Sequence, residues 1–141
     1  MIDESMTRNV RIFTPPKELP NSVVKVTGLG EDQLVKQGFL VSEPTTVQVY
    51  ALGESNSENE MGDYAWIVNS ASRTRVWEMD YRKRSRAGGA DKNIEYADDI
   101  TLPKGEYVLY CVTDDSHSSL DWNSQPPYDP LNWGVTISVK N

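Results

Sequence analysis

The stretch Leu102-Pro103-Lys104-Gly105-Glu106-Tyr107-Val108-Leu109-Tyr110-Cys111-Val112-Thr113 decides the fold class of this chain. A Pro/Gly turn opens directly onto residues 107–113, which are mostly β-branched or aromatic, and this composition is typical of a strand. Tyr107, Leu109 and Cys111 fall on one face of that strand, and Val108, Tyr110 and Val112 fall on the other. Because both faces are apolar, we expect a central strand that is covered on both sides.

The remainder of the chain is organised as further short strands separated by Gly, Pro and Asn turns. Gly38 lies inside one of them and predicts a β-bulge, and Trp77, Met79 and Tyr81 are expected to face inward from another. No segment has a helical period. The sequence therefore predicts an all-β antiparallel β-sandwich, jelly-roll-like, with about eight strands, and an up-and-down barrel is the alternative. The other expected strands are 22–27, 33–42, 46–52, 64–69, 75–81, 94–102 and 134–139.

Length and proline content predict one domain preceded by an arm. The 141 residues suit a single domain with a sizeable core. Residues 1–21 contain Pro15, Pro16 and Pro20 and read as an extended arm or linker, which leaves 22–141 as a single β-sandwich domain. Cys111 is the only cysteine, so no internal disulfide forms, and its place in mid-strand predicts a small buried side chain.

The charge balance excludes several classes of partner. With 21 acidic and 14 basic residues the net charge is −7, which opposes nucleic-acid binding and favours hard cations. No apolar run approaches the roughly 20 residues of a membrane span, so we expect no membrane insertion. Residues 1–5 also lack the basic start and apolar middle of a signal peptide.

Three pieces of the chain share a pattern with a known family. They are Gly38-Phe39-Leu40-Val41 leading to Val47-Gln48-Val49-Tyr50, then Asp63-Tyr64-Ala65-Trp66-Ile67-Val68, then the turn and strand 102–107. Over about residues 35–139 the chain resembles the bacterial pre-peptidase C-terminal domain family. The resemblance implies a small non-catalytic module of secreted bacterial proteins, often hydrolases, and hence an extracytoplasmic (periplasmic or secreted) location. It also implies a neighbouring domain of the same parent protein as a partner, and related modules bind calcium and extracellular polymers.

Oxygen-bearing side chains are concentrated just after the organising strand. Hard cations such as calcium need several oxygens that converge on one point, and this loop supplies Asp114, Asp115, Asp121 and Asn123. Asp63 and Glu54 are expected to join from the same end of the sandwich. No EF-hand spacing is present, and the alternative is that these side chains only satisfy the loop backbone. Asp114, Asp115 and Asp63 are the predicted metal ligands. No other cofactor is expected.

Aromatic side chains in the loop 113–133 predict a second kind of site. Flat rings beside amide and carboxylate groups suit a glycan, because sugar C–H faces stack on aromatic rings while hydroxyls take hydrogen bonds. The alternative is that the aromatic side chains plug the long loop onto the sandwich. The predicted ligand-binding residues are Trp122, Asn123, Tyr128, Trp133, Asp121 and His117.

Catalysis is the weakest of the functional hypotheses. His117 with Ser116 and either Asp115 or Asp121 suggests a triad, but such close neighbours rarely reach the required geometry, and no nucleophile elbow is present. One His and one buried Cys also cannot supply a zinc site. The basic loop 82–93 suits an anionic polymer or a solvated surface. We therefore expect a non-catalytic accessory module that meets a glycan at the 113–133 loop. The alternative is a structural or processing module that supports a neighbouring domain, with or without calcium.

Overall fold

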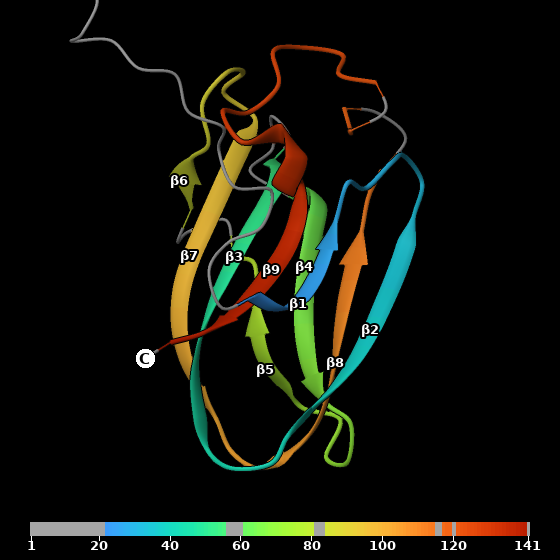
Figure 1. The fold of residues 1–141 in the computed structure, drawn as a ribbon. Coiled ribbons are helices and arrows are strands. Elements are labelled where there is room, and N and C mark those ends of the chain that lie inside the picture. The colour runs from blue at the N-terminus through green and yellow to red at the C-terminus, as the bar shows by residue number, and fades with distance from the viewer. Residues whose placement is uncertain (1–21, 56–60, 81–83, 115–116, 120, 141) are drawn as a thin grey trace, which may run out of the picture.

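The computed structural model describes residues 22–55, 61–80, 84–114, 117–119 and 121–140, which form an antiparallel β-sandwich (Figure 1). The predicted arm, residues 1–21, lies outside this described part. A single turn of 3-10 helix, η2, spans Pro130–Asn132. The strands are β1 Ser22–Thr27, β2 Leu34–Val41, β3 Thr45–Ser55, β4 Met61–Asn69, β5 Arg75–Glu78, β6 Ser85–Arg86, β7 Asn93–Leu102, β8 Gly105–Val112 and β9 Gly134–Val139.

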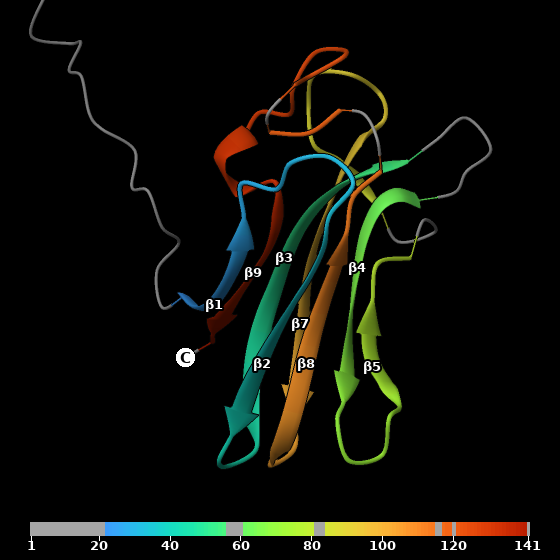
Figure 2. The ribbon, with the colours of Figure 1, turned by 90° about the vertical axis from the view of Figure 1, so that its right-hand side faces the viewer.

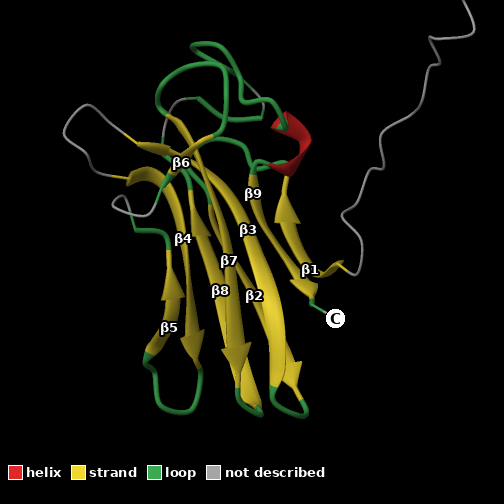
Figure 3. Ribbon diagram, turned by 90° about the vertical axis from the view of Figure 1, so that its left-hand side faces the viewer, coloured by secondary structure: helices red, strands yellow, loops and turns green. Residues whose placement is uncertain are grey.

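Two sheets face each other across the core. One has the order β6-β7-β3-β9-β1 and the other β5-β4-β8-β2 (Figures 2 and 3). They join at one end, where Glu54 of β3 pairs with Asp63 of β4. The pairs β1–β9, β2–β8 and β3–β7 are nested, as in a jelly roll. The predicted jelly-roll-like sandwich is therefore confirmed.

The organising strand, β8, lies between β2 and β4 in the middle of its sheet. Tyr107, Leu109 and Cys111 are buried in the core, as the sequence predicts. The opposite face is only half-buried, so the prediction of cover on both sides is wrong. That face is apolar for a local reason, because the ring of Tyr110 stacks on Trp66 of β4 with centroids 5.2 Å apart.

Smaller differences concern strand irregularities and boundaries. The predicted bulge at Gly38 is wrong, since β2 pairs with β8 in an unbroken register from Leu34 to Val41. In β5 and just after it, Trp77 and Met79 are buried as expected, whereas Tyr81 lies outside the described residues. The expected loop 82–93 contains the two-residue strand β6, which pairs with β7.

The two ends of the sandwich differ in the length of their connections. Short turns at residues 42–44, 70–74 and 103–104 close one end, at the bottom of Figure 1. The long connections, including 28–33, 87–92 and 113–133, gather at the opposite end, which we call the loop end. No helix in the described part of the chain is long and apolar enough to cross a membrane.

Candidate functional site

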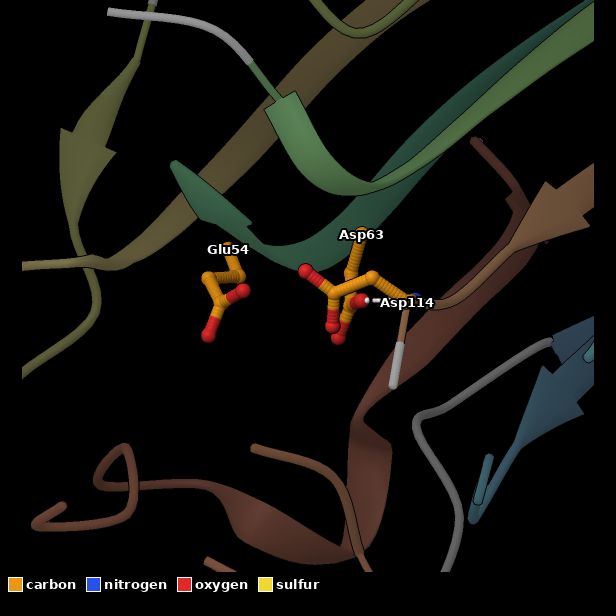
Figure 4. A group of neighbouring side chains, drawn as sticks. All are labelled: Glu54, Asp63 and Asp114. Atoms are coloured by element: carbon orange, nitrogen blue, oxygen red, sulfur yellow. Dashed lines mark hydrogen bonds between the residues drawn. The ribbon is translucent and has the colours of Figure 1, made fainter. Parts of the chain in front are cut away.

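Three carboxyl groups converge at the loop end, where the two sheets join. Glu54 is the last residue but one of β3, Asp63 lies near the start of β4, and Asp114 follows β8 (Figure 4). One carboxylate oxygen from each lies within 4.8 Å of the other two. Glu54 is 5% exposed and Asp63 only 2%, while Asp114 is half-buried. We call these three residues the acidic trio.

Two glycines allow the strands to approach closely enough to build the trio. A Cβ on Gly53 would lie 2.3 Å from the backbone oxygen of Asp63, so only glycine lets β3 and β4 meet at this point. A Cβ on Gly62 would lie 2.6 Å from a carboxylate oxygen of Asp114 and 2.8 Å from one of Glu54. The space beside Gly62 is therefore left to the carboxyl groups.

Directional hydrogen bonds fix Asp63 at the centre of the site. The backbone N–H of Asp114 donates to Oδ1 of Asp63 (2.8 Å), and the indole N–H of Trp133 donates to Oδ2 (3.0 Å). The backbone carbonyl of Asp114 accepts in turn from the N–H of Asp32 (2.7 Å). One carboxylate thus connects β4, the exit of β8 and the start of β9.

Burial sets the protonation of the trio. It raises the pKa of Asp63 to about 8, helped by the negative charges of Asp114 and Glu54 and opposed by the two N–H donors. Burial also raises the pKa of Glu54 to about 7, with a further contribution from Asp114 and opposition from Lys92. The Nζ of Lys92 lies 3.1 Å from Oε2 of Glu54. Three carboxylates beside one ammonium leave excess negative charge when all are ionised, so the site favours either protons or a cation.

His117 is buried next to the trio and is held by amide side chains. Its Nε2 donates to Oδ1 of Asn93, whose own NH2 group donates to the carbonyls of Gly88 and Gln125 (2.9 Å each). Its Nδ1 lies 3.0 Å from Oδ1 of Asn123, and that oxygen accepts a hydrogen bond from Nζ of Lys92 (2.5 Å). Burial and the charge of Lys92 lower the pKa of His117. The imidazole therefore ties loops 84–93 and 117–133 together.

The tryptophans of the long loop pack around the same histidine. His117, Trp122 and Trp133 make mutual edge-to-face contacts, with centroids 4.9–5.6 Å apart. Trp133 is fully buried and Trp122 is partly buried against the core. Tyr128 differs, because it is 88% exposed and lies with its ring against Gly88.

The structure separates the predicted site residues into three groups. Asp63 and Asp114 come together, and Glu54 joins them as expected, whereas Asp115 lies outside the described residues. His117 and Trp133 are buried, so a ligand on the surface does not reach them in this conformation. Trp122 is half-buried, and the exposed side chains are Asp121, Asn123 and Tyr128. Sequence reasoning missed Lys92 and Asn93, since nothing in a basic, Gly-containing loop signals inward-facing partners.

The fold and the site together define the class of protein as an antiparallel β-sandwich with a buried acidic trio at its loop end. No protein-family model matches the chain, and no curated protein matches it. Among solved structures, the chain is similar to the pre-peptidase C-terminal domain of collagenase from Bacillus anthracis. The identity is 14% and the TM-score 0.42, over 83% of this chain and 86% of that chain. This is a loose structural relationship.

Proposed function

We propose that this chain is a non-catalytic accessory module of an extracytoplasmic bacterial protein, and that a divalent cation, calcium by its ligand chemistry, clamps its loop end at the acidic trio. In this proposal the module supports a neighbouring domain of the same parent protein. The observation that carries the cation proposal is the convergence of Glu54 in β3, Asp63 in β4 and Asp114 just after β8, with two of the three buried.

The ligand chemistry of the trio suits calcium better than magnesium. One oxygen from each of the three carboxyl groups lies within 4.8 Å of the other two, close enough for a single cation to contact all three. Calcium also accepts irregular ligand sets completed by water, whereas magnesium demands near-octahedral geometry at about 2.0–2.1 Å. Without a cation, the buried carboxyl groups avoid excess negative charge by keeping their protons. A bound cation would neutralise the carboxylates instead.

The non-catalytic part of the proposal is supported by the surroundings of His117. Both ring nitrogens face asparagine oxygens rather than a carboxylate, so no described group orients this imidazole as the base of a triad. Asp121 is exposed, and Ser116 and Asp115 lie outside the described residues. An experiment on hydrolysis of model esters and peptides should therefore find no activity that depends on His117.

Terbium luminescence provides a direct test of the cation site, because Tb³⁺ takes calcium-like oxygen ligands and is sensitised by a nearby indole. Trp133 donates to Asp63 across 3.0 Å, so Tb³⁺ at the trio should emit when tryptophan is excited. Calcium should displace it, and calcium added to chelator-treated protein should raise the melting temperature by mass action. Isothermal calorimetry with calcium alone measures the affinity.

Matched variants distinguish calcium binding at the trio from non-specific binding to other carboxylates of the loop end. Asp63→Asn and Glu54→Gln should each abolish the calcium response, whereas Asp121→Asn, an exposed carboxylate of the same loop end, should keep it. Trp133→Phe should reduce the terbium emission more than the calcium affinity. Identical melting curves in chelator and in millimolar calcium, together with no sensitised emission, would exclude a cation at the trio. The carboxyl groups would then be neutralised by protons alone.

A glycan is the second candidate ligand, and one observation favours it. One face of the Tyr128 ring rests on Gly88 while most of the side chain is exposed, which leaves a flat surface for a sugar ring. Asn123 and Asp121 are the other exposed members of the predicted set. Binding through one such ring should be weak, in the micromolar-to-millimolar range. Tyr128→Ala should remove hits on a glycan array without changing stability, and an array without hits would reject this ligand.

A further inference from the structure

The outer border of β2 is an unpaired edge that is long enough to accept another strand. β2 pairs with β8 along its whole length and has no second partner among the described strands. In Figure 1 it forms the right-hand border of its sheet. Edge strands are usually protected by bulges, prolines or charges, but β2 has no break in register and no proline, and Lys36 is its only charged residue.

Backbone hydrogen bonds show which residues of β2 face this free edge. The N–H of Thr113 donates to the carbonyl of Gln33 (2.9 Å), at the point where the pairing of β8 with β2 begins. Backbone groups alternate between the two sides along an antiparallel strand, so the odd-numbered residues of β2 bond to β8. The N–H and C=O groups of the even-numbered residues therefore point to the free edge: Leu34, Lys36, Gly38 and Leu40.

The same even-numbered residues expose apolar side chains. Leu34 is 67% exposed and Leu40 is 76% exposed, which places both among the most exposed large hydrophobic residues of the described chain. Between them lie one lysine and one glycine. The edge thus combines two leucines six residues apart with backbone groups that no described strand pairs, and among these groups only the Gly38 carbonyl has a local partner, the side-chain amide of Gln37 (2.9 Å).

We propose that β2 pairs with β2 of a second copy of this chain, antiparallel and about a two-fold axis at Gln37. This axis places Leu34 opposite the partner's Leu40 and Lys36 opposite the partner's Gly38. Each of these pairs faces the interface with both backbone groups, so each exchanges two hydrogen bonds once the exposed Gln37 amide turns away from the Gly38 carbonyl. The two sheets then join into one continuous sheet across the dimer.

Side-chain chemistry selects this register over its neighbours. An axis at Lys36 would set two ammonium groups directly opposite each other, which is unfavourable across strands. An axis at Gly38 would set Leu40 opposite the partner's Lys36. A two-fold axis midway between two residues would pair each even-numbered residue, whose backbone faces the edge, with an odd-numbered one, whose backbone bonds to β8. The hydrogen-bond ladder between the two copies could then not form. Only the axis at Gln37 joins leucine to leucine and gives the lysine a neighbour without a side chain.

A shallow hollow beside Leu40 provides room for the second copy. It measures about 230 Å³, and its lining includes Gly38, Leu40 and Val108. The partner's Leu34 stands opposite Leu40 in the proposed register and so adds apolar surface next to this hollow. The net charge of −7 makes two copies repel at long range, and the interface itself contains no carboxylate from β2. Dimerisation should therefore strengthen as salt screens the repulsion.

Sedimentation velocity of the full chain from about 1 to about 300 μM tests the interface. We expect a reversible dimer whose population rises with concentration and with salt. Leu40→Lys should raise the dimer dissociation constant by roughly tenfold or more. Leu131→Lys, which changes an equally exposed leucine in η2, should leave the constant unchanged. A monomer at every concentration, or equal effects of the two variants, would overturn the proposal.

Engineered cysteines test the register. In the proposed dimer Gln37 lies opposite the partner's Gln37, whereas Lys36 lies opposite the partner's Gly38. After oxidation, the Gln37→Cys variant should therefore form a disulfide-linked dimer and the Lys36→Cys variant should not. Cys111 is buried and contributes no competing thiol. Cross-linking of Lys36→Cys in place of Gln37→Cys would overturn the register, and failure of both would reject the pairing. Circular dichroism of each variant confirms that the sandwich is intact.

Discussion

The two ends of the sandwich are held by different kinds of contact. At the turn end the side-chain bonds of the turn between β4 and β5 are local: the side chain of Asn69 accepts from the N–H groups of Ala71 and Ser72 (3.0 Å each), and only the backbone N–H of Ser70 reaches farther, to the carbonyl of Glu106 (2.9 Å). At the loop end the bonds join residues far apart in sequence. Asp63 accepts from Asp114 and Trp133, which lie 51 and 70 positions away.

This difference shows where the molecule is sensitive to its surroundings. The side chains that bond within the turn between β4 and β5, such as Asn69 and Ser72, are uncharged and accessible to solvent, so water replaces their bonds at little cost. The loop end buries carboxyl groups and an imidazole, whose charge states depend on pH and on cations. We therefore expect pH, cations and substitutions to act through the loop end much more than through the turns.

The largest effect should come from Trp133→Ala. It removes a fully buried indole that packs on His117 and Trp122, and it takes one of the two N–H donors from Asp63. We expect a loss of about 3–5 kcal/mol in the free energy of unfolding, measured by chemical denaturation. Tyr128→Ala, the exposed aromatic of the same loop, should cost far less. Equal losses for the two variants would show that Trp133 is not the anchor of the loop end.

The pH dependence of stability should be the next largest effect. In the folded protein the pKa of Asp63 is raised from its ordinary 3.8 to about 8, and that of Glu54 from 4.5 to about 7. Between those values the unfolded chain releases protons that the folded chain keeps, so stability without calcium should fall as pH rises from about 4 to about 8. Thermal melts in chelator across this range measure the slope.

Variants assign that slope to the trio. Asp63→Asn should flatten it, and Asp121→Asn should leave it unchanged. His117 acts in the opposite sense, because its lowered pKa costs stability when the pH falls below its ordinary 6.5. Calcium should stabilise more at pH 8 than at pH 5, since it competes with protons for the same oxygens. A slope unaffected by Asp63→Asn would place the buried protons elsewhere.

A substitution in the core strand should have a moderate effect at any pH. Cys111→Ala removes one sulfur from the centre of the sheet and should cost about 1–2 kcal/mol. Burial raises the pKa of the thiol to about 12, so Cys111 should resist thiol reagents in the folded protein. Ready labelling under native conditions would show that β8 opens far more often than its central position implies.

The smallest effect is expected at the turn end. Ser72→Ala removes the exposed hydroxyl that bonds to Thr74 (2.7 Å), and it should change the free energy of unfolding by less than about 0.5 kcal/mol. Neither calcium nor pH should alter this difference. A cost comparable to that of Cys111→Ala would mean that the two ends are not as different as their contacts indicate.

The sequence by itself determined the class of fold and every strand except the two-residue β6. Alternation and β-branched composition placed β1 and β9 at the residues where the structure has them, because the side-chain period of two is a local property. The Pro/Gly turn before β8 and the apolar core face of that strand were readable for the same reason. The exposure of the outer face of β8 could not be predicted from the sequence. Aromatic side chains that stack on a neighbouring strand, such as Tyr110 on Trp66, give the same apolar pattern as a face covered by another layer.

Only the tertiary structure decided which polar residues meet. The sequence placed Glu54, Asp63 and Asp114 at the same end of the sandwich, but they meet at one point because β3 and β4 approach at Gly53, and the sequence shows the glycine but not the approach. The same holds for the aromatic residues of the long loop. Nothing local distinguishes Trp133, which is buried, from Tyr128, which is exposed, because burial depends on the sheets that a loop crosses rather than on its composition. The sequence shows which polar and aromatic side chains are present at the loop end, but long-range packing determines which of them are buried and which contact one another.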